Sequence, residues 1–90
     1  MARKRVLLVE DHIVVRQGIK ALLSDEPDIE IVGEADNGRE ALTLVDELYP
    51  DVVLMDISMP GLNGIEATHQ ICQRHTNVKV VILSMYASEE

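Results

Sequence analysis

The 90-residue sequence predicts an α/β fold, in which a doubly wound parallel β-sheet carries helices on both faces. Four short apolar runs, each bounded by charged or turn-forming residues, have the length and composition of strands. Between them lie three segments whose apolar residues recur every three or four positions, as on one face of a helix. The two kinds of segment alternate in the order βαβαβαβ with short connections, which favours right-handed crossovers between parallel strands.

The four predicted strands are not equally apolar. Residues 6–9, 52–55 and 78–83 are apolar nearly throughout, which is typical of strands covered on both faces. Ile29–Ala35 alternates between apolar and polar residues and therefore predicts a strand with one exposed face. The core must be aliphatic, because the sequence has no Trp or Phe and only two Tyr.

The first predicted helix follows Asp11, which stands at the position of an N-cap. Its inner face is expected to consist of residues spaced by three and four positions, namely Val15, Gly18, Ile19, Leu22 and Leu23. Pro27 lies just beyond the expected end of this helix, where a proline commonly follows.

The second and third helices are predicted from the same period. Asp36, in the turn sequence Asp-Asn-Gly, is expected to cap the second helix, and Pro50 is expected to end it. The inner face of the second helix should contain Ala41, Leu44, Val45 and Leu48. The inner face of the third helix should contain Ile65, Thr68, Ile71 and Cys72, with Cys72 as a small core residue.

Composition and charge exclude several classes of function. The net charge is −8 and the pI is near 4.7, so this segment lacks the basic surplus that binding to double-stranded DNA requires. The one basic cluster, residues 3–5, leads directly into a strand, and we interpret it as a solubilising terminus. The single Cys72 cannot form an internal disulfide, and no apolar run is long enough for a signal peptide or a membrane span. We therefore expect a cytoplasmic protein that does not contact a membrane.

Polar residues follow directly after three of the predicted strands. Glu10 and Asp11 follow the first strand, Asp56 follows the third and Ser84 follows the fourth. In open α/β sheets, ligands bind beyond the carboxyl ends of the strands, where the strand order reverses. If the first and third strands are neighbours there, three carboxylates meet in one pocket, and Mg²⁺ would relieve their mutual repulsion. An Asp carboxylate in such a site can also act as a nucleophile and accept a phosphoryl group.

Three segments carry a resemblance to a known family. Residues 7–12 (LLVEDH), residues 53–64 (VLMDISMPGLNG) and residues 81–86 (VILSMY) resemble the motifs of the receiver domains of two-component response regulators, in order and at the family spacing. The resemblance covers essentially all 90 residues, and three motifs together are far more specific than any one of them. It implies a flavodoxin-like fold and a phosphorylation-dependent signalling switch.

The resemblance also implies a role for each candidate site residue. Asp56 would accept a phosphoryl group from a sensor histidine kinase, and Ser84 would be the switch hydroxyl that moves toward this group. Asp11 and Asp56 would bind Mg²⁺ directly, together with the backbone carbonyl of Ser58, and Glu10 would act through a bound water. The domain would not be an enzyme beyond Mg²⁺-dependent self-phosphorylation and autodephosphorylation.

A smaller set of residues resembles the subfamily that carries a C-terminal LuxR-type helix-turn-helix domain. His12, the stretch at residues 15–18 (VRQG) and the pair Ser84-Met85 carry this finer resemblance. It implies a transcription regulator whose DNA contacts come from an output domain outside this segment.

The sequence departs from the family pattern at its C-terminal end. The family has an active-site Lys at the end of a fifth strand and an aromatic switch residue on that strand, and the sequence ends before either. Lys79 is no substitute, because it lies near the start of the fourth strand, at the wrong end of the sheet. We therefore expect residues 1–90 to be the N-terminal portion of a receiver domain, truncated before the fifth strand and the last helices. The free apolar edge of the fourth strand then predicts poor stability or self-association.

Two other functions remain open. An aspartyl-phosphate phosphatase or phosphotransferase would require a second acid two residues after the nucleophile, where this sequence has Ser58. A non-phosphorylated interaction module, or an inactive fragment on the same fold, is the other alternative. Among single residues, Asp36 is expected to be a cap and not a ligand, and His12 a solvated helix start. His69 and His75 lack the spacing of zinc ligands.

Overall fold

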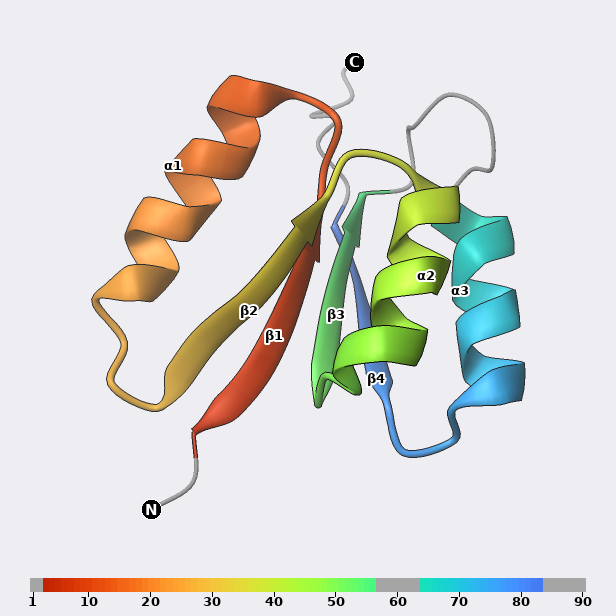
Figure 1. Cartoon of the computed structure of the whole chain (residues 1–90). Coiled ribbons are helices and arrows are strands. Elements are labelled where there is room, and N and C mark those ends of the chain that lie inside the picture. The colour runs from red at the N-terminus through yellow and green to blue at the C-terminus, as the bar shows by residue number, and fades with distance from the viewer. Residues whose placement is uncertain (1–2, 57–63, 84–90) are drawn as a thin grey trace.

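The computed structural model describes residues 3–56 and 64–83, and its elements alternate as predicted. In chain order they are β1 (Lys4–Val9), α1 (Ile13–Ser24), β2 (Ile29–Ala35), α2 (Gly38–Leu48), β3 (Val52–Asp56), α3 (Gly64–Arg74) and β4 (Lys79–Leu83). The described strands pair in parallel to form one sheet. In Figure 1, α1 covers one face of this sheet and α2 and α3 cover the other. The predicted α/β architecture with helices on both faces is confirmed.

The strand order, β2-β1-β3-β4, creates the point at which a ligand site is expected. The chain passes from β1 to β2 on one side of β1 and then returns to β3 on its other side. Val9 of β1 pairs with Met55 of β3, so the residues that follow this pair leave the sheet next to each other. This reversal of strand order is the topological switch point of an open α/β sheet.

The main core lies between the sheet and the pair α2 and α3. Its members are small or aliphatic, and they are Leu7, Val9, Ala35, Ala41, Val45, Val53, Met55, Ala67 and Ile71. The burial of one large aliphatic side chain stabilises a fold by about 1.5–3 kcal/mol. Alternate residues of β1 point to the opposite face, where Val6 and Leu8 are also buried.

The face covered by α1 is less completely packed. No residue of α1 is buried; Val15, Ile19 and Leu23 are half-buried, whereas Gly18 is exposed and Leu22 is 74 % exposed. The predicted inner face of α1 is therefore correct for three residues and wrong for two. In Figure 1, α2 and α3 lie on the opposite face of the sheet from α1, so neither of them covers the exposed Leu22.

Both predicted helix caps are wrong by one residue. His12, not Asp11, occupies the N-cap position of α1, and its side chain makes no capping hydrogen bond. At α2 the cap is Asn37, not Asp36: Asn37 Oδ1 accepts the backbone N–H of Glu40 at 2.8 Å. The Glu40 carboxylate in turn accepts the backbone N–H of Asp36 at 3.0 Å, so the two side chains satisfy two free backbone donors reciprocally. Asp11 is thereby left available for the site described below.

The inner face of α3 also differs from the prediction. Gly64, Ala67 and Ile71 are buried, whereas Ile65 is 67 % exposed and Cys72 is exposed. The expectation of Cys72 as a core residue is therefore wrong. The buried positions are mostly small, and a helix with small residues on its inner face can approach its neighbour closely. A prediction that looks for large apolar residues therefore places most of the inner face of α3 one position too far along the chain.

Replacement of Asn37 by Ala is expected to destabilise the domain by about 1 kcal/mol, because the backbone N–H of Glu40 loses its acceptor. Urea denaturation followed by circular dichroism measures the change. Glu47→Ala, at an exposed position of the same helix, is the matched control, with an expected change within about 0.5 kcal/mol. An equal loss in both variants would mean that the cap is unimportant.

Two further observations concern the surface. In the described part of the chain β4 is an edge strand, and Val81 and Ile82 are 46 % and 42 % exposed. The association predicted through this edge stays a prediction. None of the helices in the described ranges has the length and apolar character needed to cross a bilayer.

Candidate functional site

Four side chains that can bind a metal ion meet where β1 and β3 end. Glu10, Asp11, His12 and Asp56 each offer one ligand atom, and these atoms lie within 4.8 Å of one another. The three carboxylates predicted to converge therefore do so. The parallel register of β1 and β3 is the cause, because Glu10 follows Val9 and Asp56 follows Met55. We call these four residues the acidic cluster.

Burial distinguishes the members of the acidic cluster. Glu10 is fully buried and Asp56 is 1 % exposed, whereas the side chain of Asp11 is 22 % exposed. Desolvation by burial raises the pKa of Glu10, and the negative charge of Asp56 adds to this effect. Hydrogen bonds from the backbone and the ring of His12 oppose the rise in this pKa. The interior end of the cluster therefore concentrates negative charge in a poorly solvated place.

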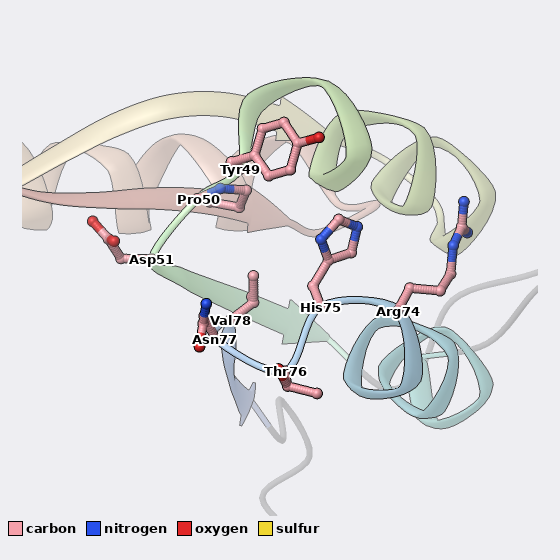
Figure 2. A pocket seen from close by; sticks show the side chains of 8 residues that line it. All are labelled: Tyr49, Pro50, Asp51, Arg74, His75, Thr76, Asn77 and Val78. Atoms are coloured by element: carbon pink, nitrogen blue, oxygen red, sulfur yellow. The ribbon is translucent and has the colours of Figure 1, made fainter.

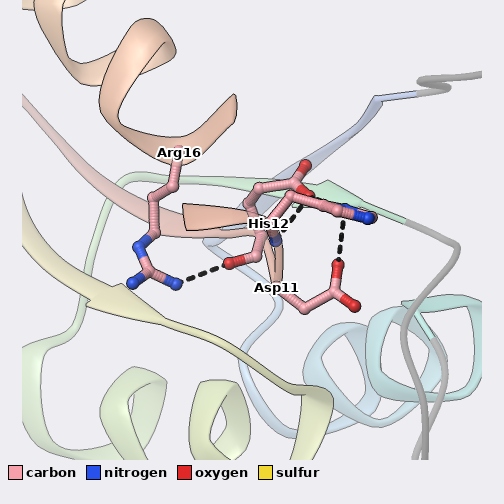
Figure 3. Close-up of polar contacts among 4 residues, drawn as sticks. Asp11, His12 and Arg16 are labelled. Carbon is pink, nitrogen blue, oxygen red and sulfur yellow. Dashed lines mark hydrogen bonds and ion pairs between the residues drawn. The ribbon is translucent and has the colours of Figure 1, made fainter. Parts of the chain in front are cut away.

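His12 joins the cluster although the sequence favoured a solvated helix start. Its side chain is 66 % exposed, yet its Nδ1 lies 3.1 Å from Glu10 Oε2 and 3.2 Å from Asp11 Oδ1. Figure 3 shows the imidazole beside the Asp11 carboxylate at the start of α1. The hydrogen bond to Glu10 is the main cause of a raised pKa of His12, and the charge of Asp11 is the next. Both contacts favour a positive charge at this position.

The acidic cluster fits a hard divalent cation such as Mg²⁺. It supplies carboxylate oxygens, the ligands that Mg²⁺ prefers. Glu10 Oε1 is buried and accepts no hydrogen bond from any described residue, and such an oxygen is costly to bury without a positive partner. The carboxylates of Glu10, Asp11 and Asp56 are the groups that could hold the ion.

Arg16 is the site residue that sequence reasoning missed. From α1 its Nη1 donates a hydrogen bond of 2.7 Å to the backbone carbonyl of Glu10. Figure 3 marks this bond by the dashed line that starts at the Arg16 guanidinium. In the sequence, residues 15–18 indicate only the resemblance to the subfamily with a LuxR-type output domain. Its position four residues after His12 is the one available signal, because it puts Arg16 one turn above the acidic cluster.

The other predicted residues fall outside the cluster or outside the described ranges. Ser58 and Ser84 lie outside the described residues, so their roles stay predictions. Asp51 lies at the opposite end of the sheet, as expected, where its Oδ2 accepts the backbone N–H of Arg5 at 2.8 Å. Lys79 lies at that same end, since its backbone N–H bonds to the Asp51 carbonyl at 3.0 Å.

A pocket of about 390 Å³ lies at this opposite end, between the end of α2 and the α3–β4 connection (Figure 2). It is lined by Tyr49, Pro50, Asp51, Arg74, His75, Thr76, Asn77 and Val78. Its charged side chains have partners within the domain. Arg74 of α3 forms an ion pair with Asp46 of α2, and His75, just after α3, makes a hydrogen bond between its Nε2 and Asp46 Oδ1 at 2.6 Å. These contacts connect α2 to the end of α3, and nothing in the pocket's chemistry indicates a ligand.

Comparison with known proteins identifies the family. The family model described as "Response regulator receiver domain" matches residues 6–90. The transcriptional regulatory protein LiaR of Bacillus subtilis is 48 % identical over 86 residues, which are 96 % of this chain and 41 % of that protein. The chain therefore spans about two fifths of the length of this relative.

Solved structures agree with this result. A two-component response regulator of the LuxR family from Aurantimonas sp. superposes with a TM-score of 0.89 and 38 % identity, covering 97 % of this chain and 62 % of that one. The response regulator domain of Thermotoga maritima CheB superposes with a TM-score of 0.88 and 40 % identity, covering 97 % of this chain and 64 % of that one. The predicted flavodoxin-like receiver fold is confirmed, and the chain belongs to the family of response-regulator receiver domains.

Proposed function

We propose that this chain is a phosphorylation-dependent switch of a two-component system, which accepts a phosphoryl group on Asp56 with the help of Mg²⁺. The observation that carries the proposal is the convergence of Glu10, Asp11 and Asp56 at the switch point of a receiver-family sheet. The phosphodonor would be a phosphohistidine of a sensor histidine kinase.

The transfer is a displacement at phosphorus. A carboxylate oxygen of Asp56 attacks the phosphorus atom and forms a P–O bond, while the P–N bond to the kinase histidine breaks. The electron pair of the broken bond stays on the imidazole nitrogen, which takes up a proton. A bound Mg²⁺ would neutralise the charge that three carboxylates and a phosphoryl group bring together.

The neighbouring residues would have supporting roles. Asp11 and the backbone carbonyl of Ser58 would complete the ion's protein ligands with Asp56, and Glu10 would act through water. Ser84 would donate a hydrogen bond to a phosphoryl oxygen, and its movement toward this oxygen would couple phosphorylation to a change in conformation. The roles of Ser58 and Ser84 rest on the sequence motifs alone.

We infer a stoichiometric phosphoacceptor and not a turnover enzyme. Ser58 stands two residues after Asp56, where an aspartyl-phosphate hydrolase would need an acid or base. In a longer protein the phosphorylated domain would control a DNA-binding output domain, by analogy with LiaR, which is named a transcriptional regulatory protein. With a net charge of −8, the present segment would not itself bind DNA.

Labelling with acetyl phosphate in the presence and absence of Mg²⁺ tests the proposal. We expect one phosphoryl group per chain, dependent on Mg²⁺, lost when the ion is chelated, and located on Asp56 by mass spectrometry. The measurement is made on this chain and on a longer version that continues through a fifth strand, because a Lys supplied there would help to neutralise the phosphoryl group. Labelling of neither version, or labelling that does not need Mg²⁺, would refute the proposed function.

A further inference from the structure

Arg16 connects three elements around the acidic cluster without touching a carboxylate of the cluster. Its side chain is 17 % exposed, and Nη1 donates to the Glu10 carbonyl at 2.7 Å. Its Nε lies 3.2 Å from Glu34 Oε1 of β2, a distance typical of an ion pair although the geometry is not that of a hydrogen bond. Lys20, one turn further along α1, contacts the other oxygen of the same carboxylate at 2.8 Å.

The hydrogen bond to the Glu10 carbonyl determines the orientation of one particular peptide group. This carbonyl belongs to the planar unit that joins Glu10 to Asp11, so its direction fixes the direction in which Asp11 leaves β1. The N–H of Glu10 is held separately by the Ala35 carbonyl at 3.0 Å. With both sides of Glu10 held, the peptide groups that set the directions of the Glu10 and Asp11 side chains are held in place.

We propose that Arg16 is a positioning residue for the Mg²⁺ and phosphoryl site, which acts by holding the Glu10–Asp11 peptide group in place. The proposal rests on the proposed function. The ion pair with Glu34 holds the Arg16 guanidinium in its orientation. The planar guanidinium can contact the Glu34 carboxylate through Nε and the Glu10 carbonyl through Nη1 at the same time. Residues that orient metal ligands commonly change metal affinity by about 10- to 100-fold when they are removed.

Charge and geometry predict opposite results when Arg16 is removed. The loss of a positive charge near three carboxylates should strengthen the attraction for a cation. The loss of the hydrogen bond to the Glu10 carbonyl should weaken cation binding, because the ligands are no longer held in position. The sign of the change in Mg²⁺ affinity therefore separates positioning from simple electrostatics.

The experiment compares Arg16→Met, Arg16→Lys and Lys20→Met with the wild-type chain. Lys20→Met is the matched control, since it removes the same charge and a contact to the same Glu34 but none to Glu10. Calorimetric titration with Mg²⁺ should show affinity about tenfold lower in Arg16→Met. Arg16→Lys should fall in between, and Lys20→Met should bind as tightly as wild type or more tightly.

A second measurement needs neither the metal nor phosphorylation. Loss of a hydrogen bond shifts the signal of a carbonyl carbon upfield, so the ¹³C carbonyl resonance of Glu10 should move in metal-free Arg16→Met and stay in place in Lys20→Met. An unchanged Glu10 carbonyl resonance in Arg16→Met would overturn the positioning role, and so would Mg²⁺ affinity that rises in Arg16→Met as in Lys20→Met. In either case the proposed function would still stand if the wild-type chain is labelled on Asp56. A wild-type chain that does not bind Mg²⁺ would overturn both.

Discussion

Asp56→Asn is expected to abolish labelling by acetyl phosphate completely while leaving the fold intact. The Asn amide has nearly the same volume as the carboxylate, so the buried position at the end of β3 stays filled. It is not a nucleophile at neutral pH, so no P–O bond can form. The substitution also removes one negative charge from beside Glu10, whose pKa the charge of Asp56 helps to raise. The thermal midpoint of the variant should therefore equal or exceed that of the wild type.

Mass spectrometry of intact protein and of peptides measures the labelling, and circular dichroism checks the fold. Asp51→Asn is the control, because Asp51 lies at the opposite end of the sheet, beside Arg5. This control should be labelled like the wild type. Persistent labelling of Asp56→Asn, with the phosphoryl group on Asp51 or Asp36, would mean that another carboxylate is the acceptor.

Asp11→Ala is expected to abolish the binding of Mg²⁺. Asp11 is the most exposed carboxylate of the acidic cluster and the one that can reach an incoming ion without deep burial. Under the proposed function its removal would take away a direct ligand, so the affinity should fall below what calorimetry can measure. It also reduces the repulsion within the cluster, so the metal-free variant should be at least as stable as the wild type.

Thermal melts provide a second measurement of the same variant. A ligand that binds only the folded state stabilises it by RT ln(1 + [L]/Kd), about 2.7 kcal/mol at a concentration of 100 Kd. Mg²⁺ should therefore raise the melting temperature of the wild type and not that of Asp11→Ala. Asp36→Ala, with its carboxylate at the same edge of the sheet but outside the cluster, should respond like the wild type. An equal response of Asp11→Ala to Mg²⁺ would exclude Asp11 as a ligand.

The sheet and the convergence of the carboxylates could be predicted because both follow from patterns along the strands. An apolar strand that ends in Glu10-Asp11 and another that ends in Asp56 need only to be neighbours for their acids to meet. Parallel α/β topology has few alternatives, and the structure meets the condition that the first and third strands are neighbours.

The caps were harder to predict, because neighbouring polar residues compete for the same role. Asp36 and Asn37 are both good cap residues, and the fold uses Asn37 because its oxygen reaches the Glu40 N–H. At α1 the N-cap position is occupied by His12, whose side chain makes no capping hydrogen bond, while Asp11 belongs to the acidic cluster. A tertiary position that overrides the local capping preference is not visible in that preference itself.

Arg16 left only its spacing of four residues after His12 as a signal, since a long side chain that contacts a backbone carbonyl leaves no apolar pattern in the sequence. The register of α3 was missed for a related reason. Its buried positions include Gly64 and Ala67, and small residues contribute little to an apolar pattern although they allow close packing.

The contacts of Asp46 with Arg74 and His75 bear on how this domain would respond to a signal. At that end of the sheet Arg74 compensates the charge of Asp46, whereas at the other end three carboxylates lie close together, with His12 and Arg16 as the neighbouring basic side chains. Without a cation, excursions to open conformations should therefore be concentrated near the ends of β1 and β3, because segments of low local stability open first. Under the proposed function, a cation or a phosphoryl group bound there would act on the most responsive part of the domain, and it would shift the conformational population while the opposite end changed little.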